Sequence, residues 1–392
     1  MIFDRLGPYH VARLWSASKF FEIVGIEIVA ETSEYAWSHT ASVPQVKRIT
    51  LFPSDMAREK SNRLLETRIQ ESLSDSGCCA VAIPGWSSRA ALAALCWCNE
   101  RSIPSVLMSE STIHDEPRVW WKELVKRRLV RLYTTALVGG RRHIEYLMRL
   151  GMARDRIFTG YDVVDNAYFE GKAEQVRVEK SEVRTKYGLS DNYFLASARF
   201  IKKKNLVGLL RAYATYRGLV GEVAWDLVLL GDGELRGKLE AERAALGLNG
   251  HVVLPGFKQY DELPLYYANA SAFVHASTSE QWGLVVNEAI ASGLPVIVSS
   301  RCGCVPELVH PENGFTFDPF NESNLTSRMV MLSSMPKDER EKLGRASAEI
   351  ASRHGLSNFG EGLQHAVDMA LQIRPKKPRT HDRILLNSLL LR

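Results

Sequence analysis

Short apolar runs alternate with segments of helical periodicity throughout the second half of the chain, and this alternation constrains the fold more than any other feature. The runs predicted to be strands are NYFLASA (192–198), WDLVLLG (225–231), HVVLP (251–255), AFVHAS (272–277) and PVIVSS (295–300). The predicted helices begin at 205 or span 234–246, 261–269, 283–292 and 306–309. This order predicts right-handed β-α-β units and a parallel, doubly wound sheet.

The first half contains pieces of the same kind, although they are less regular. Its predicted strands are IEIVAET (26–32), CCAVAIPG (78–85), SIPSVLMS (102–109) and TTALVGG (134–140), and a helix is predicted over 141–151. Because 392 residues exceed the usual size of a single core, we expect an α/β protein with two Rossmann-like domains that face each other across a cleft.

Composition suggests where the domains divide. Residues 171–186 are charged and poor in apolar side chains, so we place a hinge near 170–180. We predict one domain over 1–175, a second over 176–355, a helix over 356–373 that packs back toward the first domain, and a basic, leucine-rich tail over 374–392. The first predicted strand has only three residues, so either the true start lies upstream or the strand is short.

The overall composition excludes several classes of protein. Apolar residues make up 45% and charged residues 24%, as in soluble globular proteins, and we expect neither a signal peptide nor a membrane-spanning helix. The six cysteines lack the C-x2-C spacing of a zinc site, so we expect a reducing cytoplasm. A net charge of +5 suits phosphate-bearing ligands or anionic lipid and is too weak to indicate nucleic acid.

Two carboxylates, Glu280 and Glu288, lie on either side of a predicted helix start at Gly283. The first turn of a helix has unpaired N–H groups and the positive end of the macrodipole, so it can bind phosphate. Side chains lean toward the N-terminus of their helix, so we expect both carboxylates to converge there. Acidic groups beside a phosphate repel it unless they accept hydrogen bonds from hydroxyl groups. A nucleotide sugar, with a diphosphate between ribose and hexose, fits this pattern.

Other predicted strand-end loops offer groups for the same ligand. Arg199 and Lys204 follow the first strand of the second domain and can neutralise a diphosphate, although a basic loop in solvent is the alternative. The loops GDGE (231–234) and PGFK (255–258) add glycine and exposed backbone N–H groups. Together with the two glutamates, these loops occupy four consecutive strand ends.

These motifs occur in an order that resembles the retaining, GT-B-fold glycosyltransferases of family GT4. The motifs are GYDVVDNAYF (160–169), Arg-x4-Lys (199–204), GDGE, PGF, Glu-x7-Glu (280–288), CG (302–303) and NGFTFDP (313–319). The resemblance is strong over residues 130–320 and loose before them.

The resemblance implies roles for particular residues. Glu280 would hold the hydroxyl groups of the donor sugar, and Arg199 and Lys204 would stabilise the departing diphosphate. Glu288 would hold the ribose, and the backbone near Phe257 would receive the base. The remaining predicted donor-binding residues are Gln281, Trp282, Gly283, Leu284, Gly233, Glu234 and Lys258. The sequence lacks a D-x-D pair, so we expect no metal and no cofactor apart from the nucleotide sugar.

The first domain departs from the family pattern at two places. Gly7-Pro8-Tyr9-His10 stands where many members have a GG loop, and Glu110 stands where many have a histidine. Either the segment 109–111 or nearby His114 would then do the histidine's work. We therefore take Gly7, His10, Glu110 and His114 as candidate acceptor-side residues, although each histidine alone is more often structural.

Two segments have the pattern of membrane-surface helices. Residues 117–134 place Trp120, Trp121 and Leu124 on one side of a helix among basic residues, so this helix either lies on anionic lipid or buries its tryptophans in the core. In the tail, a basic patch precedes Ile384, Leu385, Leu386 and 389–391. Peripheral contact with the inner face of the membrane would suit a lipid-linked acceptor.

Taken with this resemblance, which implies that the anomeric configuration is retained, the sequence predicts a retaining, metal-independent hexosyltransferase. Its donor would be a UDP-sugar or, as second choice, a GDP-sugar, and its acceptor a glycan or lipid-linked glycan in bacterial-type polysaccharide or glycolipid synthesis. A nucleotide-sugar epimerase of the same fold is one alternative, although it needs no large acceptor face. A catalytically silent binding module is another, although it would be expected to lose Glu280, Arg199 or Lys204.

Overall fold

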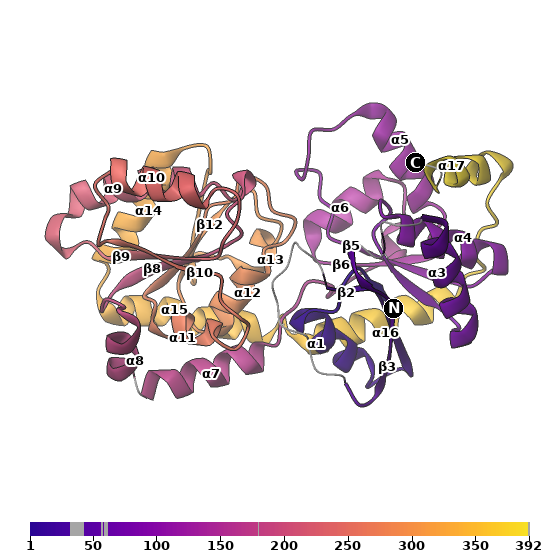
Figure 1. Cartoon of the computed structure of the whole chain (residues 1–392), viewed down its shortest axis with the longest axis horizontal. Coiled ribbons are helices and arrows are strands. Elements are labelled where there is room, and N and C mark those ends of the chain that lie inside the picture. The colour runs from indigo at the N-terminus through magenta and orange to yellow at the C-terminus, as the bar shows by residue number, and fades with distance from the viewer. Residues whose placement is uncertain (32–42, 56–57, 59–61, 179, 391–392) are drawn as a thin grey trace. The chain divides into compact units, whose positions relative to one another are not determined.

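The computed structural model describes residues 1–31, 43–55, 58, 62–178 and 180–390, which form two compact units. Unit 1 comprises Met1–Val164 and Gly355–Arg392, and unit 2 comprises Asp165–His354 (Figure 1). The boundary expected at residue 175 falls inside helix α7 (Asn166–Val178). Only Phe169 and Ala173 of that helix are buried, so its composition resembles that of a linker.

Unit 2 is built on a six-stranded parallel sheet. Its strands are β8 (Tyr193–Ser197), β9 (Asp226–Leu230), β10 (Val252–Gly256), β11 (Ala272–His275), β12 (Val296–Ser299) and β13 (Gly314–Phe317). Their order in the sheet is β10-β9-β8-β11-β12-β13, and every neighbouring pair is parallel. The chain reverses its direction of travel across the sheet between β8 and β11, which is where ligands bind in doubly wound folds.

Helices cover both faces of this sheet (Figure 1). They are α7, α8 (Lys180–Tyr187), α9 (Leu206–Val220), α10 (Arg236–Ala245), α11 (Leu263–Asn269), α12 (Leu284–Ala291), α13 (Val305–Leu308), α14 (Glu322–Ser334) and α15 (Lys337–Ser352). Helices α9, α10 and α14 lie on one face, and α7, α11 and α15 lie on the other (Figure 1). The strands and helices predicted for 192–309 are confirmed, while β13 was not predicted because it was taken only as part of a motif.

Unit 1 has two smaller parallel sheets. One contains β1 (Ile2–Phe3), β2 (Ile23–Glu31) and β3 (Val46–Ser54), and the other contains β4 (Val81–Pro84), β5 (Ser105–Ser109), β6 (Thr135–Val138) and β7 (Ile157–Thr159). Strands β1 and β4 lie beside each other, but β1 has only two residues and does not pair with β4 as a sheet neighbour. The short first strand and the four further strands predicted here are confirmed as β1, β2, β4, β5 and β6, although Thr32 of the predicted run 26–32 lies outside the described residues. Strand β3 was missed because it is half exposed and carries charged residues and a proline.

Apart from the C-terminal tail, the helices of unit 1 include one that follows unit 2 in the sequence. They are α1 (Pro8–Ala17), α3 (Asn62–Ser76), α4 (Arg89–Arg101), α5 (Trp120–Val130), α6 (Arg141–Arg149) and α16 (Leu356–Gln372). Helix α16 packs against α1, β6 and β7. The approach is close, because a Cβ atom on Gly362 would lie 2.1 Å from the carbonyl oxygen of Thr159.

The C-terminal tail is docked on unit 1. Helix α17 (Thr380–Leu390) packs against α4, with Leu386 buried and Leu389 and Leu390 against the same core. Arg89 donates a hydrogen bond to the carbonyl oxygen of Leu390. Leu386, Leu389 and Leu390 are therefore packed on protein, whereas Ile384 is exposed, and contact of the tail with lipid stays a prediction. Leu391 lies outside the described residues.

Helix α5 shows the opposite behaviour. Its Trp120 side chain is 75% exposed and Trp121 is 47% exposed, so the alternative in which both tryptophans enter the core is wrong. Leu129 and Val130 at the other end of the helix are buried instead. In the described part of the chain, no helix is long and apolar enough to cross a membrane.

Candidate active site

Four loops at the carboxyl edge of the unit 2 sheet carry most of the predicted site residues. Arg199 follows β8, Gly233 follows β9, Phe257 follows β10 and Glu280 follows β11. These four strands are neighbours in the order β10-β9-β8-β11. Since the carboxyl ends of parallel strands lie at one edge of a sheet, the fold brings the four loops together.

Backbone hydrogen bonds hold these loops against one another. The N–H of Thr278, after β11, donates to the carbonyl oxygen of Lys203, after β8, at 2.8 Å. The N–H of Phe200, after β8, donates to the carbonyl oxygen of Asp232, after β9, also at 2.8 Å. Gly231 has φ +127°, and a Cβ atom there would lie 1.9 Å from a carbonyl oxygen of the β8 loop. Glycine is therefore required for this close approach.

Glu280 lies at the centre of this edge, with its side chain 11% exposed. Its Oε2 atom accepts hydrogen bonds from Lys204 Nζ, from His275 Nε2 at 3.2 Å and from Ser277 Oγ at 3.2 Å. Burial alone would raise the pKa of Glu280, but Lys204 and the His275 hydrogen bond together hold this pKa far below its ordinary value. The carboxylate is therefore ionised although it is almost enclosed.

His275 was not among the residues predicted from the sequence. It is the last residue of β11 and is buried. Burial lowers its pKa, the hydrogen bond with Glu280 opposes this, and Lys204 adds to the lowering, so the imidazole is neutral near pH 7. The signal that could have identified it is a histidine at the end of the otherwise apolar strand Ala272–His275.

Glu288 has different surroundings. It lies in α12, is fully buried and accepts a hydrogen bond from Tyr267 Oη at 2.7 Å. Burial and then Glu288 itself raise the pKa of Tyr260, whose ring stacks on that of Tyr168 at 4.9 Å between centroids. Glu280 thus lies among basic and hydroxyl groups, whereas the neighbours of Glu288 are tyrosine side chains, Tyr267 and Tyr260.

Helix α12 begins where the sequence predicted. Gly283 precedes its first residue with φ +105°, a conformation that favours glycine. The Trp282 indole is buried and donates from Nε1 to Asn287 Oδ1 at 2.8 Å, so this side chain is held in the protein interior. The loop of Cys302 and Cys304 braces this segment, since Gly303 N–H donates to the Glu280 carbonyl oxygen at 3.0 Å.

The remaining predicted donor-side residues lie around this edge at different depths. Lys258 Nζ lies 3.4 Å from Glu262 Oε1. Glu234 and Phe257 are exposed, and the half-buried residues are Arg199, Gln281, Leu284 and Lys258.

The predicted acceptor-side residues all belong to unit 1. The N–H of Gly7 donates to His10 Nδ1 at 3.2 Å at the start of α1, and burial followed by the neighbouring Arg13 lowers the pKa of His10 to about 3. This histidine therefore caps a helix as a neutral ring. His114 is exposed after β5, where its N–H donates to Thr112 Oγ1 at 3.2 Å.

Glu110, at the position of the family histidine, lies beside a buried carboxyl group. That group is Asp162, which follows β7 and has Arg13 Nη2 at 3.7 Å from its Oδ1 atom. Burial and then Glu110 raise the pKa of Asp162 well above its usual range. The carboxyl edge of unit 1 thus combines polar groups from three loops.

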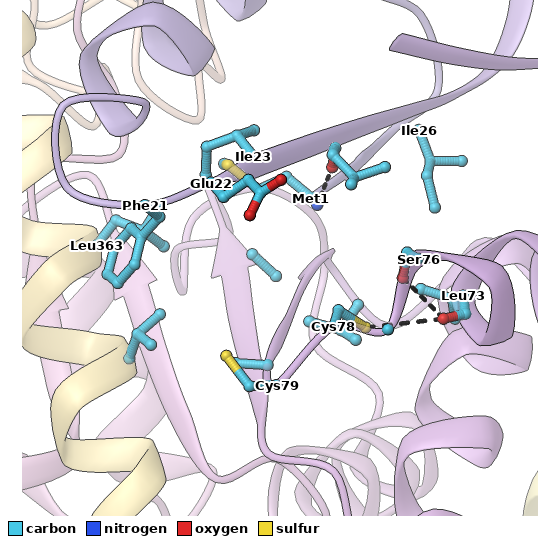
Figure 2. A pocket seen from close by; sticks show the side chains of 16 residues that line it. Met1, Phe21, Glu22, Ile23, Ile26, Leu73, Ser76, Cys78, Cys79 and Leu363 are labelled. Carbon is cyan, nitrogen blue, oxygen red and sulfur yellow. Dashed lines mark hydrogen bonds between the residues drawn. The ribbon is translucent and has the colours of Figure 1, made fainter. Parts of the chain in front are cut away.

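A cavity of about 330 Å³ in unit 1 lies away from these residues (Figure 2). Met1, Ile23 and Val81, at the starts of β1, β2 and β4, line it together with Cys78 and Cys79. It therefore opens at the amino edge of the strands, opposite to the predicted site. Among the residues that the structure describes, no group of three or more His, Cys, Asp or Glu is placed to hold a metal ion.

The architecture is that of GT-B glycosyltransferases. The solved structure of Alr3699/HepE from Anabaena in complex with UDP superposes with a TM-score of 0.69 at 16% identity, covering 94% of this chain and 98% of that protein. This likeness confirms the predicted fold class, two Rossmann-like units with parallel sheets.

The sequence comparisons confirm the family resemblance. Residues 179–349 match the model of the family described as Glycosyl transferases group 1. An uncharacterized glycosyltransferase of Methanocaldococcus jannaschii, MJ1607, is 32% identical over 197 residues, which are 50% of each chain. Alpha-monoglucosyldiacylglycerol synthase of Streptococcus pneumoniae is 35% identical over 136 residues, which are 34% of this chain and 30% of that protein. The matched part thus spans half or less of these relatives.

Proposed function

We propose that the protein is a retaining glycosyltransferase that moves a hexose from a nucleoside diphosphate to a glycan or lipid-linked acceptor. The observation that carries the proposal is the Lys204–Glu280 pair at the start of α12, on the carboxyl edge of the unit that matches the group 1 family. UDP is the first candidate nucleotide, because the similar HepE structure was solved in complex with UDP, and GDP is the second.

In this proposal, unit 2 binds the donor. The diphosphate lies against the first turn of α12, with Arg199 and Lys204 beside it, and Glu288 holds the ribose. Breaking the bond between sugar C1 and the phosphate oxygen leaves negative charge on the diphosphate. Fixed cations and N–H dipoles stabilise that charge more in the transition state than in the ground state. These groups can act without a metal ion, so we propose metal-independent transfer.

Helix α5 supports an acceptor at a lipid surface. Trp120, Trp121 and Leu124 are exposed beside exposed Lys122 and Arg128, a combination that suits the interface of an anionic bilayer. One relative of this chain is the alpha-monoglucosyldiacylglycerol synthase of Streptococcus pneumoniae, whose name indicates a glycolipid product. We therefore propose peripheral contact with the cytoplasmic face of a membrane.

Liposome flotation tests this contact. The wild type should float with vesicles that contain anionic lipid, and the variant Trp120→Ser/Trp121→Ser should float less by about tenfold. Leu219→Ser, on an exposed site of unit 2, is the matched control and should float like the wild type. Equal flotation of all three proteins would remove α5 from the proposal.

A thermal-shift panel of UDP-, GDP- and ADP-sugars tests donor binding without an acceptor, since a ligand that binds the folded state raises its melting temperature. Product analysis then separates transfer from epimerisation. Free nucleoside diphosphate with a glycosylated acceptor supports the proposal, whereas an isomerised nucleotide sugar identifies an epimerase. No shift with any donor would contradict the proposal, and loss of all activity in chelator would contradict metal independence.

A further inference from the structure

His275 is a buried polar residue in an apolar strand, and its imidazole points toward the Glu280 carboxylate, which the strand itself does not require. The other residues of β11 are Ala272, Phe273 and Val274, which are apolar and buried. A polar ring among them costs free energy unless its nitrogen atoms find partners. Its Nε2 atom lies 3.2 Å from Glu280 Oε2, so the strand ends by aiming the imidazole at that carboxylate.

The partners of Glu280 are distributed unequally between its two oxygen atoms. Lys204, His275 and Ser277 all contact Oε2. Within the described part of the chain, the side-chain hydrogen bonds of Glu280 leave Oε1 without a partner, and Oε1 is not among the enclosed side-chain atoms that lack a hydrogen-bond partner, so it is not fully enclosed. One oxygen is thus fixed to the protein, and the other is open to a ligand.

Two of these three hydrogen-bond donors, His275 and Ser277, are suited to remain in place when the nucleotide sugar binds. In the proposed function, the diphosphate attracts Lys204, which then shares its charge between the phosphate and Glu280. His275 is buried at the end of its strand, and Ser277 Oγ lies 3.2 Å from both His275 Nε2 and Glu280 Oε2. The carboxylate therefore keeps two neutral donors even if Lys204 turns toward the phosphate.

We propose that His275 is a positioning residue for the donor sugar: with Ser277 it holds Oε2 of Glu280, so that Oε1 accepts hydrogen bonds from hydroxyl groups of the hexose. This inference rests on the proposed function and deepens it. The ionised carboxylate can only accept at Oε2, so the neutral ring carries its proton on Nε2. The charged groups that face the ring are Glu280, Lys204 and Lys203.

Binding measurements on two variants test the proposal. His275→Leu removes the hydrogen-bond donor and fills its place with an apolar side chain of similar size. His275→Gln keeps an N–H group near the position of Nε2. By calorimetry, His275→Leu should bind the nucleotide sugar about tenfold more weakly and the nucleoside diphosphate within about twofold of wild type. Turnover should fall on the order of 10- to 100-fold. His275→Gln should recover most of both losses.

The pattern of losses separates the possible outcomes. Equal weakening of nucleotide sugar and nucleoside diphosphate would mean a merely structural role and would overturn the proposal, as would unchanged affinity for both. Ser277→Ala should show the same selective loss to a smaller degree. If the wild type binds the nucleotide sugar no more tightly than the nucleoside diphosphate, this inference alone is overturned. If the wild type binds neither the nucleotide sugar nor the nucleoside diphosphate, the proposed function is overturned as well.

A spectroscopic test needs no ligand. In the wild-type chain labelled with ¹⁵N-histidine, the His275 signals should be those of a neutral ring protonated on Nε2 between pH 6 and 8, and Glu280→Gln should shift them. An imidazolium, or a ring protonated on Nδ1, would overturn the proposed geometry whatever the nucleotide experiments show.

Discussion

At the carboxyl edge of the unit 2 sheet, the enclosed Glu280 stays ionised because Lys204 and His275 lower its pKa. At the carboxyl edge of unit 1, Asp162 is also enclosed and His10 is half-buried, but burial lowers the pKa of His10 to about 3 and raises the pKa of Asp162, which favours the neutral form of both. Keeping a buried charge costs free energy and is sustained by placed partners. At these two edges, unit 2 therefore keeps an enclosed charge by means of placed partners, whereas burial in unit 1 favours the neutral forms of His10 and Asp162.

Loss of the Glu280 carboxylate should give the largest effect. Glu280→Ala should lower turnover on the order of 100- to 1,000-fold, since it removes the group proposed to hold the sugar in the transition state. Affinity for the nucleoside diphosphate should change less than threefold. Steady-state kinetics and calorimetry measure the two quantities, and Glu349→Gln on exposed α15 is the control. A loss confined to diphosphate affinity would contradict the assignment.

Replacement of Lys204 should have a somewhat smaller effect that depends on pH. Lys204→Met should lower turnover by about 100-fold, because the departing diphosphate loses a cation. It should also raise the pKa of Glu280, since Lys204 is the first of the groups that lower it. The acid limb of the pH–rate profile should therefore move to higher pH. An acid limb at the wild-type position would show that Lys204 does not control this carboxylate.

Glu288→Ala should act mainly on binding. We expect about a tenfold loss of affinity for the nucleoside diphosphate, because the variant loses the group proposed to hold the ribose. Glu288 also accepts a hydrogen bond from Tyr267, so Glu288→Gln, which retains an acceptor, controls for damage to the fold. The ribose assignment falls if calorimetry finds that both variants bind the diphosphate as tightly as wild type.

Replacement of His10 should change stability and its dependence on pH, and its effect on turnover should be the smallest of the series. Its pKa is about 3 in the folded state and about 6.5 in the unfolded state, so the unfolded chain binds more protons between these values. Stability then falls as the pH falls from 6.5 to 3. His10→Gln keeps an acceptor for Gly7 but does not titrate, so its free energy of unfolding should fall less steeply over this window in urea titrations. Parallel curves would contradict the burial of a neutral His10.

Much of unit 2 could be predicted from the sequence because its determinants are local. Apolar runs and helical periodicity predicted β8 to β12 and the helices between them. Because the carboxyl ends of parallel strands meet at one edge of a sheet, the sequence also predicted that Lys204 lies near Glu280, 76 residues away. His275 was missed because its importance depends on a partner that only the folded loop supplies. The edge strand β3 was not predicted because it carries charged residues and a proline. Helix α7 was taken as part of a hinge because most of its side chains are exposed and polar, as in a linker.

The exposure of α5 and the docking of α17 could not be decided from sequence. Both helices combine basic and apolar residues, so either could lie on lipid or pack on protein. The outcome depends on whether a complementary apolar surface is available. Helix α4 supplies one for Leu386, whereas no comparable burial is found for Trp120. Amphipathic pattern alone therefore does not distinguish the two fates.

The return of α16 to unit 1 also bears on how the chain folds during synthesis. Phe359, Leu363 and Ala366 of this helix share an apolar cluster with Val106 and Leu137 of the β4–β7 sheet. The ribosome releases these three side chains only after all of unit 2 has emerged. We therefore expect unit 2 to complete its core first, while unit 1, although it starts earlier, lacks α16 until late in synthesis and until then exposes apolar surface that chaperones can bind.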